Sequence, residues 1–80
     1  MNKINFSIVI PVLNEEKNIT GLTFKIKKFC KNYIYEIIYV DDNSLDNSSK
    51  ILNKLELKNN NLKYYIRKNK KKDLSASIFL

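Results

Sequence analysis

Two adjacent carboxylates stand at the end of an apolar run in this sequence. Asp41 and Asp42 directly follow the run Glu-Ile-Ile-Tyr-Val at positions 36–40. Because neighbouring carboxylates repel each other, hydrogen-bond donors, a cation or water must offset the cost of placing them there. A carboxylate in this position can accept a hydrogen bond from a nucleobase N–H or a ribose hydroxyl. In the alternative interpretation, one Asp caps the following helix and the other faces solvent.

A second polar segment, Pro-Val-Leu-Asn-Glu-Glu at positions 11–16, follows the first apolar run. Capping of a following helix would explain Asn14 and one glutamate, because an Asn side chain accepts from free N–H groups and carboxylates favour a helix N-terminus. Capping requires neither Pro11 nor the second glutamate. A glutamate at this point could instead bind a ribose or a base.

A basic run follows the last apolar run of the chain. Arg67 is followed by Lys68 and by lysines at positions 70–72. Such a loop would suit a diphosphate, although it could equally be solvated surface. The single glycine excludes the glycine-rich phosphate loops, so side chains or a metal would have to hold any diphosphate. With no histidine and only one cysteine, the chain holds neither a zinc site nor a Cys-His nucleophilic pair.

Composition sets the broad limits. The chain has 80 residues, enough for one domain at most, and 44% of them are hydrophobic. A net charge of +7 favours an anionic partner: a nucleic acid, a phosphate-rich ligand or an anionic membrane surface. A general bias toward Lys and Asn would explain the same charge. The lone Cys30 permits no intrachain disulfide and fits a reducing cytoplasm. No signal peptide and no apolar stretch of membrane-spanning length is present, so a soluble or peripheral chain is expected.

The elements that position these residues can be read from periodicity. Residues 6–10 read as a buried strand closed by Pro11. A helix of about four turns is expected next, capped by Asn14 with Glu15 and Glu16 in its first turn. Its core positions are predicted to be Ile19, Leu22, Ile26, Phe29, Cys30 and Tyr33.

The second half repeats the alternation. Residues 36–40 read as a strand, followed by a turn and cap at Asn43, Ser44 and Asp46. A helix with a core stripe of Ile51, Leu52 and Leu55 comes next, and the asparagines at 59–61 end it. Residues 62–66 read as a third strand, and Asp73 or Ser75 is expected to cap a third helix.

This order predicts an α/β fold, a Rossmann-like parallel sheet of the pattern β-α-β-α-β-α with helices on both faces. In such sheets ligands bind outside the carboxyl ends of the strands. The three unusual segments, 11–16, 41–46 and 67–73, all fall at that edge. Their coincidence predicts a ligand site there.

The two N-terminal motifs together resemble the opening of family 2 glycosyltransferases. The motifs are Pro-Val-Leu-Asn-Glu at 11–15 and Val-Asp-Asp-Asn-Ser-Leu-Asp at 40–46. The resemblance implies the N-terminal half of a GT-A nucleotide-sugar-binding fold. Arg67 with the basic stretch and Asp-Leu-Ser-Ala-Ser at 73–77 is most similar to polyprenol-phosphate (dolichyl-phosphate) mannosyl- or glucosyltransferases.

Residue roles follow from the resemblance by position. Pro11, Leu13 and Glu15 would line the nucleotide pocket. Val40 and Asp42 would contact the base or ribose, with Asp41 beside them. Arg67 would lie near the base or the diphosphate. Leu13 stands where an aromatic residue is often found, which would weaken stacking on the base.

The resemblance also implies what lies beyond residue 80. The family's Asp-x-Asp motif holds a divalent cation, Mg²⁺ or Mn²⁺, and is absent from this chain, as is the acceptor-binding half. Residues 1–80 are therefore expected to be an incomplete glycosyltransferase domain that recognises the nucleotide and has no activity alone. The complete enzyme would transfer a hexose from a GDP-mannose or UDP-glucose type donor to an acceptor such as polyprenyl phosphate, in the cytoplasm or at the cytoplasmic membrane face.

Two other functions remain open at this point. A regulatory receiver domain would also place an acidic pair at a strand end, but after its first strand, and it would need an Asp where Arg67 stands. A small basic nucleic-acid-binding module would use the lysine run with Tyr64 and Tyr65 as stacking groups. Adjacent residues on a strand point to opposite faces, so at least one of these tyrosines is expected to pack under a helix. No nucleic-acid partner is therefore expected.

Overall fold

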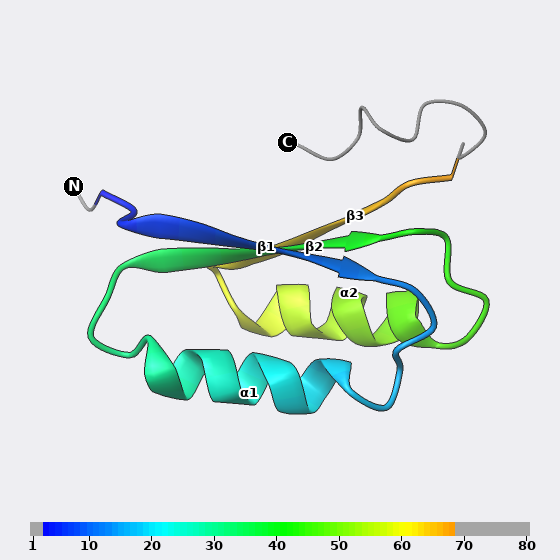
Figure 1. Ribbon diagram of the computed structural model, residues 1–80, viewed down its shortest axis with the longest axis horizontal. Helices are drawn as coiled ribbons and strands as arrows, with labels where there is room; N and C mark the ends of the chain where they lie inside the picture. The colour runs from blue at the N-terminus through cyan, green and yellow to red at the C-terminus, as the bar shows by residue number, and fades with distance from the viewer. Residues whose placement is uncertain (1–2, 69–80) are drawn as a thin grey trace.

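A computed structural model describes residues 3–68, which form one parallel sheet with two helices packed on it (Figure 1). The strands lie in the order β1-β2-β3, and both neighbouring pairs are parallel. This confirms the predicted Rossmann-like alternation. The third helix predicted at Asp73 or Ser75 lies outside the described residues. In chain order the elements are β1 (Phe6–Val12), α1 (Ile19–Phe29), β2 (Tyr35–Asp41), α2 (Ser48–Lys58) and β3 (Leu62–Ile66).

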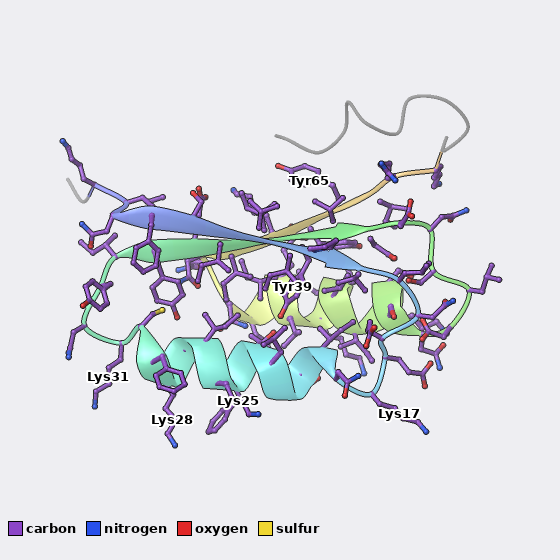
Figure 2. The ribbon with its side chains drawn as sticks, viewed as in Figure 1. Lys17, Lys25, Lys28, Lys31, Tyr39 and Tyr65 are labelled. Atoms are coloured by element: carbon purple, nitrogen blue, oxygen red, sulfur yellow. The ribbon has the colours of Figure 1, made fainter. Side chains whose placement is uncertain are left out.

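Both helices cover the same face of the sheet (Figure 1). The prediction of helices on both faces is therefore wrong for residues 3–68. The strand order advances in one direction, so successive right-handed crossovers must pass over the same face. The opposite face is open: Val9 is 49% exposed and Tyr65 is 59% exposed. Figure 2 shows Tyr39 pointing toward the helices and Tyr65 pointing to the other side of the sheet.

The core fills the layer between the sheet and the two helices. On β2, alternate residues are buried and the ones between them are half-buried, as expected for a strand with one covered face. The buried hydrophobic side chains come from all five elements and from both ends of the sheet. They are Val12, Ile19, Tyr35, Ile37, Tyr39, Leu52 and Leu62.

Helix α1 begins later than the sequence predicted. Asn18, not Asn14, is its N-cap, and the first turn contains no acidic residue. The helix has 11 residues, about three turns rather than four. Asn14 instead adopts a left-handed backbone with φ of 51°, which a helix N-cap does not use.

The predicted core stripe of α1 is half right. Ile19 is buried, and Ile26 and Cys30 pack against the core. The other three predicted positions face solvent: Leu22 is 39% exposed, Phe29 is 82% exposed and Tyr33 is 55% exposed.

Thr23 takes the place that the apolar pattern gave to a larger residue. It is 2% exposed, and its hydroxyl donates to the Ile19 carbonyl at 2.9 Å and also contacts the Tyr39 hydroxyl. Both polar groups are thereby satisfied inside the core. Burial of Tyr39 raises the pKa of its hydroxyl, and the hydrogen bond with Thr23 partly opposes that rise.

The remaining elements agree closely with the sequence prediction. Leu52 is fully buried on α2, while Ile51 and Leu55 pack at the edge of the core. Strand β1 continues through Pro11 rather than stopping before it. A proline is tolerated there because β1 pairs only with β2 among the described strands, so its missing N–H breaks no second ladder.

The packing predicts unequal effects for two leucines on α2. Leu52 is 0% exposed and Leu57 is 78% exposed. Leu52→Ala should lower the free energy of unfolding by about 2–5 kcal/mol, since it leaves a cavity under the sheet. Leu57→Ala should change it by less than about 0.5 kcal/mol. Urea unfolding followed by circular dichroism measures both, and equal effects of the two substitutions would contradict the described core.

Candidate nucleotide-binding edge

The carboxyl ends of the three strands meet at one edge, which brings the predicted polar segments together. The Asp42 N–H donates to the Val12 carbonyl at 2.9 Å, and the Arg67 N–H donates to the Asp41 carbonyl at 2.8 Å. These backbone bonds extend the sheet past the last paired residues. They place the acidic pair between the segment that follows β1 and the start of the basic run.

Asp41 is the most unusual group at this edge. Its residue is 1% exposed, and its side chain lies on the helix-covered side of β2. One carboxylate oxygen, Oδ1, accepts from the Ser44 N–H at 3.0 Å and from the Ser44 hydroxyl at 2.5 Å. The other oxygen, Oδ2, is buried without a hydrogen-bond partner among the described residues. An orphaned buried carboxylate oxygen is costly, and Oδ2 keeps the capacity to accept a further hydrogen bond.

Asp42 has a different environment. Its Oδ1 accepts from Arg67 Nη2 at 3.0 Å and from Nε at 3.3 Å. The side chains of Arg67 and Asp42 are 27% and 32% exposed, so the ion pair is only partly withdrawn from water. Neither Asp41 nor Asp42 caps α2, so the alternative interpretation of the acidic pair is wrong.

Asn14 and Ser44 join the loop after β1 to the loop after β2. The Asn14 N–H donates to the Ser44 hydroxyl oxygen at 2.8 Å. In return, Asn14 Oδ1 accepts from the Leu45 N–H at 2.8 Å. The left-handed backbone of Asn14 turns its side chain to this role, and asparagine tolerates that conformation better than most residues.

Three further bonds continue the same connection. The Glu15 N–H donates to the Ser48 hydroxyl at 3.1 Å, and the Glu16 N–H donates to Asp46 Oδ2 at 3.2 Å. Glu16 Oε1 accepts from the Asn47 N–H at 2.9 Å. The prediction that both glutamates lie in the first turn of α1 is therefore wrong: Glu16 binds the opposite loop through its carboxylate and its N–H, and Glu15 binds it through its N–H alone. We call these five bonds between segments 14–16 and 44–48 the loop clasp.

Asp46 also takes part in helix capping, as predicted. Its Oδ1 accepts from the Ser48 N–H at 2.9 Å, which satisfies a free donor at the start of α2. A hydrogen bond from the Ser48 side chain, with backbone N–H groups of Ser48 and Glu16, lowers the pKa of Asp46 below its ordinary 3.8, and burial partly opposes this.

A cavity of about 120 Å³ opens beside β1 at this edge. Two of the predicted site residues, Pro11 and Glu15, line it together with Tyr39. Glu15 Oε1 accepts from Asn18 Nδ2 at 2.8 Å, so its carboxylate lies at the start of α1. The remaining lining residues are Ile10, Val12, Asn18, Ile19 and Leu22.

The other predicted residues lie apart from this cavity. Leu13 is 53% exposed in the loop after β1. Val40 is half-buried on the open face of the sheet, where it pairs in register with Pro11. The structure thus brings Asp41, Asp42 and Arg67 together, and it brings Pro11 and Glu15 together.

The sequence interpretation placed Ser44 in a turn without giving it a partner, and it did not single out Ser48. Ser44 and Ser48 donate or accept hydrogen bonds with Asp41 and within the clasp, and their only signal was a position a few residues past the acidic pair.

Within residues 3–68 no group of three Asp, Glu, His or Cys side chains could hold a metal ion. No helix among the described elements is long and apolar enough to cross a membrane.

The fold is a Rossmann-like parallel α/β sheet, and its polar residues gather at the carboxyl edge, where such sheets bind their ligands. The sequence profile of Glycosyl transferase family 2 matches residues 7–79. The chain therefore belongs to glycosyl transferase family 2, which confirms the resemblance seen in its two N-terminal motifs.

Several curated relatives are named undecaprenyl-phosphate 4-deoxy-4-formamido-L-arabinose transferase. The protein of Proteus mirabilis (strain HI4320) is 48% identical over 54 residues, which are 65% of this chain and 16% of the relative. That of Pseudomonas fluorescens (strain SBW25) is 50% identical over 48 residues, 58% of this chain and 14% of the relative. The matched segment thus spans about a sixth of each relative's length. The name of these relatives agrees with the polyprenol-phosphate subgroup that the sequence resembles.

Asn14 contributes two features to the clasp, a left-handed backbone and a side-chain acceptor for the Leu45 N–H, and substitutions can separate them. Asn14→Gly keeps the left-handed backbone but loses the acceptor for Leu45, so it should lower the free energy of unfolding by about 0.5–1.5 kcal/mol. Asn14→Ala loses both features and should cost about 1–2 kcal/mol more. Asn14→Asp keeps both and should stay near the wild-type value. Chemical denaturation gives the ranking, and an Ala variant as stable as the Gly variant would contradict it.

The lowered pKa of Asp46 predicts a stability loss in acid. As pH falls, the unfolded chain takes up a proton at Asp46 before the folded chain does. The contribution of the Asp46 charge to the free energy of unfolding is therefore complete above about pH 4. It disappears as pH falls through the lower pKa of the folded state. Urea midpoints at neutral pH and near pH 3 should show wild type and Asp46→Asn converging in acid. A difference between them that is independent of pH would show that the charge of Asp46 has no role.

Proposed function

We propose that this chain is the nucleotide-recognition part of an enzyme that transfers a sugar from a nucleotide sugar to a polyprenyl phosphate. The observation that carries the proposal is Asp41 Oδ2. It is a buried carboxylate oxygen without a partner among the described residues, at the edge where Rossmann-like sheets bind nucleotides. A base N–H or a ribose hydroxyl would supply the missing donor.

The neighbouring residues would supply the other contacts to a nucleoside diphosphate. Asp42 would accept from the ribose or base, and Arg67 beside it would favour the diphosphate charge. Pro11 and Glu15 line the cavity and would contact the base or the ribose. Leu13 and Val40 are assigned to the pocket by family resemblance and would supply apolar contact.

We further propose an acceptor and a donor for the complete enzyme. The relatives are named as undecaprenyl-phosphate transferases, which supports a lipid-phosphate acceptor. The sequence resemblance implies a donor in which GDP or UDP carries a hexose. The relatives are instead named as transferases of a formamido-L-arabinose. Binding to GDP or to UDP separates the two nucleotide classes. If the enzyme transfers sugar to a lipid acceptor, it would act at the cytoplasmic face of a membrane.

The divalent cation implied by the family has no ligand set in residues 3–68. Asp42 is already paired with Arg67, and Asp41 Oδ1 is occupied by Ser44. These carboxylates do not fit a metal site, so we assign them to nucleotide contact alone. The Asp-x-Asp motif that would hold the cation remains a prediction for a longer polypeptide, as does the absence of activity from the 80 residues.

The nucleic-acid alternative receives no support. Tyr64 packs against the core and its hydroxyl lies 3.4 Å from Asn53 Oδ1, while Tyr65 lies on the open face. The two rings therefore point to opposite faces, as the strand pattern predicted, and do not form one stacking surface. The family match covers the same residues.

Calorimetric titration with GDP, UDP and a random oligonucleotide tests the proposal. One nucleoside diphosphate should bind selectively. Asp41→Asn keeps the acceptor for Ser44 but turns the unpartnered oxygen into an amide donor, so affinity should fall roughly 10- to 100-fold. Asp42→Ala should also weaken binding. Glu56→Gln on α2 removes one carboxylate away from the edge and is the matched control.

Two results would count against this function. Equal affinity of wild type and Asp41→Asn for the nucleotide would remove Asp41 from the site. Salt-sensitive binding of the oligonucleotide, with no binding of either nucleotide by the folded chain, would restore the basic-module alternative.

A further inference from the structure

The outward side of α1 exposes two aromatic rings. Phe24 is 64% exposed and Phe29 is 82% exposed. Gly21 lies on the same side with open space around it. Isolated exposed apolar residues are ordinary, but two phenylalanines on one short helix leave a large apolar area in water. This surface lies on the far side of α1 from the sheet and therefore takes no part in the core.

Lysines lie between and beside these rings. At about 100° per residue, the two phenylalanines are about 140° apart on the helix, and Lys25 and Lys28 fall between them. Lys31 follows just past the helix end. Figure 2 shows Lys25, Lys28 and Lys31 on the side of α1 away from the sheet. We call Phe24, Lys25, Lys28, Phe29 and Lys31 the α1 outer face.

No carboxylate balances this charge on the helix. The sequence of α1, Ile19–Phe29, contains no Asp or Glu. Lys28 Nζ lies 5.8 Å from the centroid of the Phe24 ring, so the cation and the ring share one surface. The remaining helix lysine, Lys27, instead donates to Asn59 Oδ1 at 2.7 Å. The outer face is therefore apolar and cationic at once.

We propose that the α1 outer face docks on an anionic lipid bilayer. The phenylalanine rings would enter the boundary between headgroups and acyl chains, and the lysine ammonium groups would remain among the headgroup phosphates. Because Lys25 and Lys28 lie at the centre of this convex surface and the rings at its margins, contact of the lysines with headgroup phosphates would lead the docking and the rings would add apolar contact at the sides. Single-stranded nucleic acid is bound in grooves with stacking platforms, and a convex helix does not provide one.

Docking in this way has a geometric consequence for the carboxyl edge. Helix α1 runs along the sheet and begins shortly after segment 14–16, which forms one side of the loop clasp (Figure 1). With α1 lying flat on a bilayer, that edge would stand about one helix diameter from the headgroups. If the proposed function holds, a lipid-phosphate acceptor would then be within reach, although the docking itself does not depend on nucleotide binding.

Co-sedimentation of the 80-residue chain with vesicles tests the docking. Vesicles of phosphatidylcholine alone are compared with vesicles that also contain phosphatidylglycerol. Binding should require the anionic lipid and weaken as salt is raised. Phe24→Ala with Phe29→Ala should reduce partitioning roughly tenfold or more, since both rings leave the interface. Lys25→Gln with Lys28→Gln should reduce it roughly fivefold for each lysine.

Matched controls come from α2. Leu57→Ala removes an exposed apolar side chain, and Lys50→Gln with Lys54→Gln removes the same charge from exposed positions. All variants are checked for native circular dichroism, which surface substitutions should preserve. The controls should retain wild-type partitioning.

Four outcomes would overturn the proposal. One is an absence of binding to anionic vesicles by the folded wild type. Another is equal weakening by the α2 lysine pair, which would indicate general charge attraction. The third is unchanged partitioning of the double phenylalanine variant. The fourth is a preference for oligonucleotide over vesicles in competition. Nucleotide titration of the same variants should be unaffected, so failure of this proposal and failure of the proposed function can be told apart.

Discussion

The loop clasp is the interaction on which the carboxyl edge depends. Two loops about thirty residues apart in sequence exchange five hydrogen bonds, in which backbone N–H groups meet side-chain oxygens. Asn14 and Ser44 stand at its centre. Without the clasp, several N–H groups of two connecting loops would have to find water or remain unpaired. With it, the starts of α1 and α2 hold a fixed relation to the sheet and to each other.

The clasp also explains why a buried carboxylate can exist here. Ser44 accepts from Asn14 and donates to Asp41, so a single serine links the clasp to the acidic pair. Asp41 is thus held by one oxygen while the other stays uncommitted. Such an arrangement is unfavourable for stability alone, since a fully satisfied side chain would cost less. Local departures from the most stable choice are typical of ligand sites.

Residues 3–68 present three surfaces with different physical characters. The carboxyl edge is polar and contains the buried acid. The open face of the sheet exposes large apolar side chains, among them Val9 and Tyr65. The outer face of α1 combines aromatic rings with unbalanced positive charge. The first follows from parallel strands ending together, and the second follows from a strand order that puts both helices on one side.

The sequence by itself determined the strands and the helix after the acidic pair through its apolar runs, and the family through its two N-terminal motifs, because hydrophobic periodicity and local motifs are properties of neighbouring residues. The burial of Leu52 and the placing of the polar segments at one edge followed from the same pattern. Tertiary structure alone decided that Asn14 binds Leu45 rather than capping α1, and that Thr23 enters the core while Phe29 leaves it. Each depends on partners distant in sequence: a hydrogen bond from the opposite loop in the first case, and the Tyr39 hydroxyl in the second. A local pattern cannot contain that information.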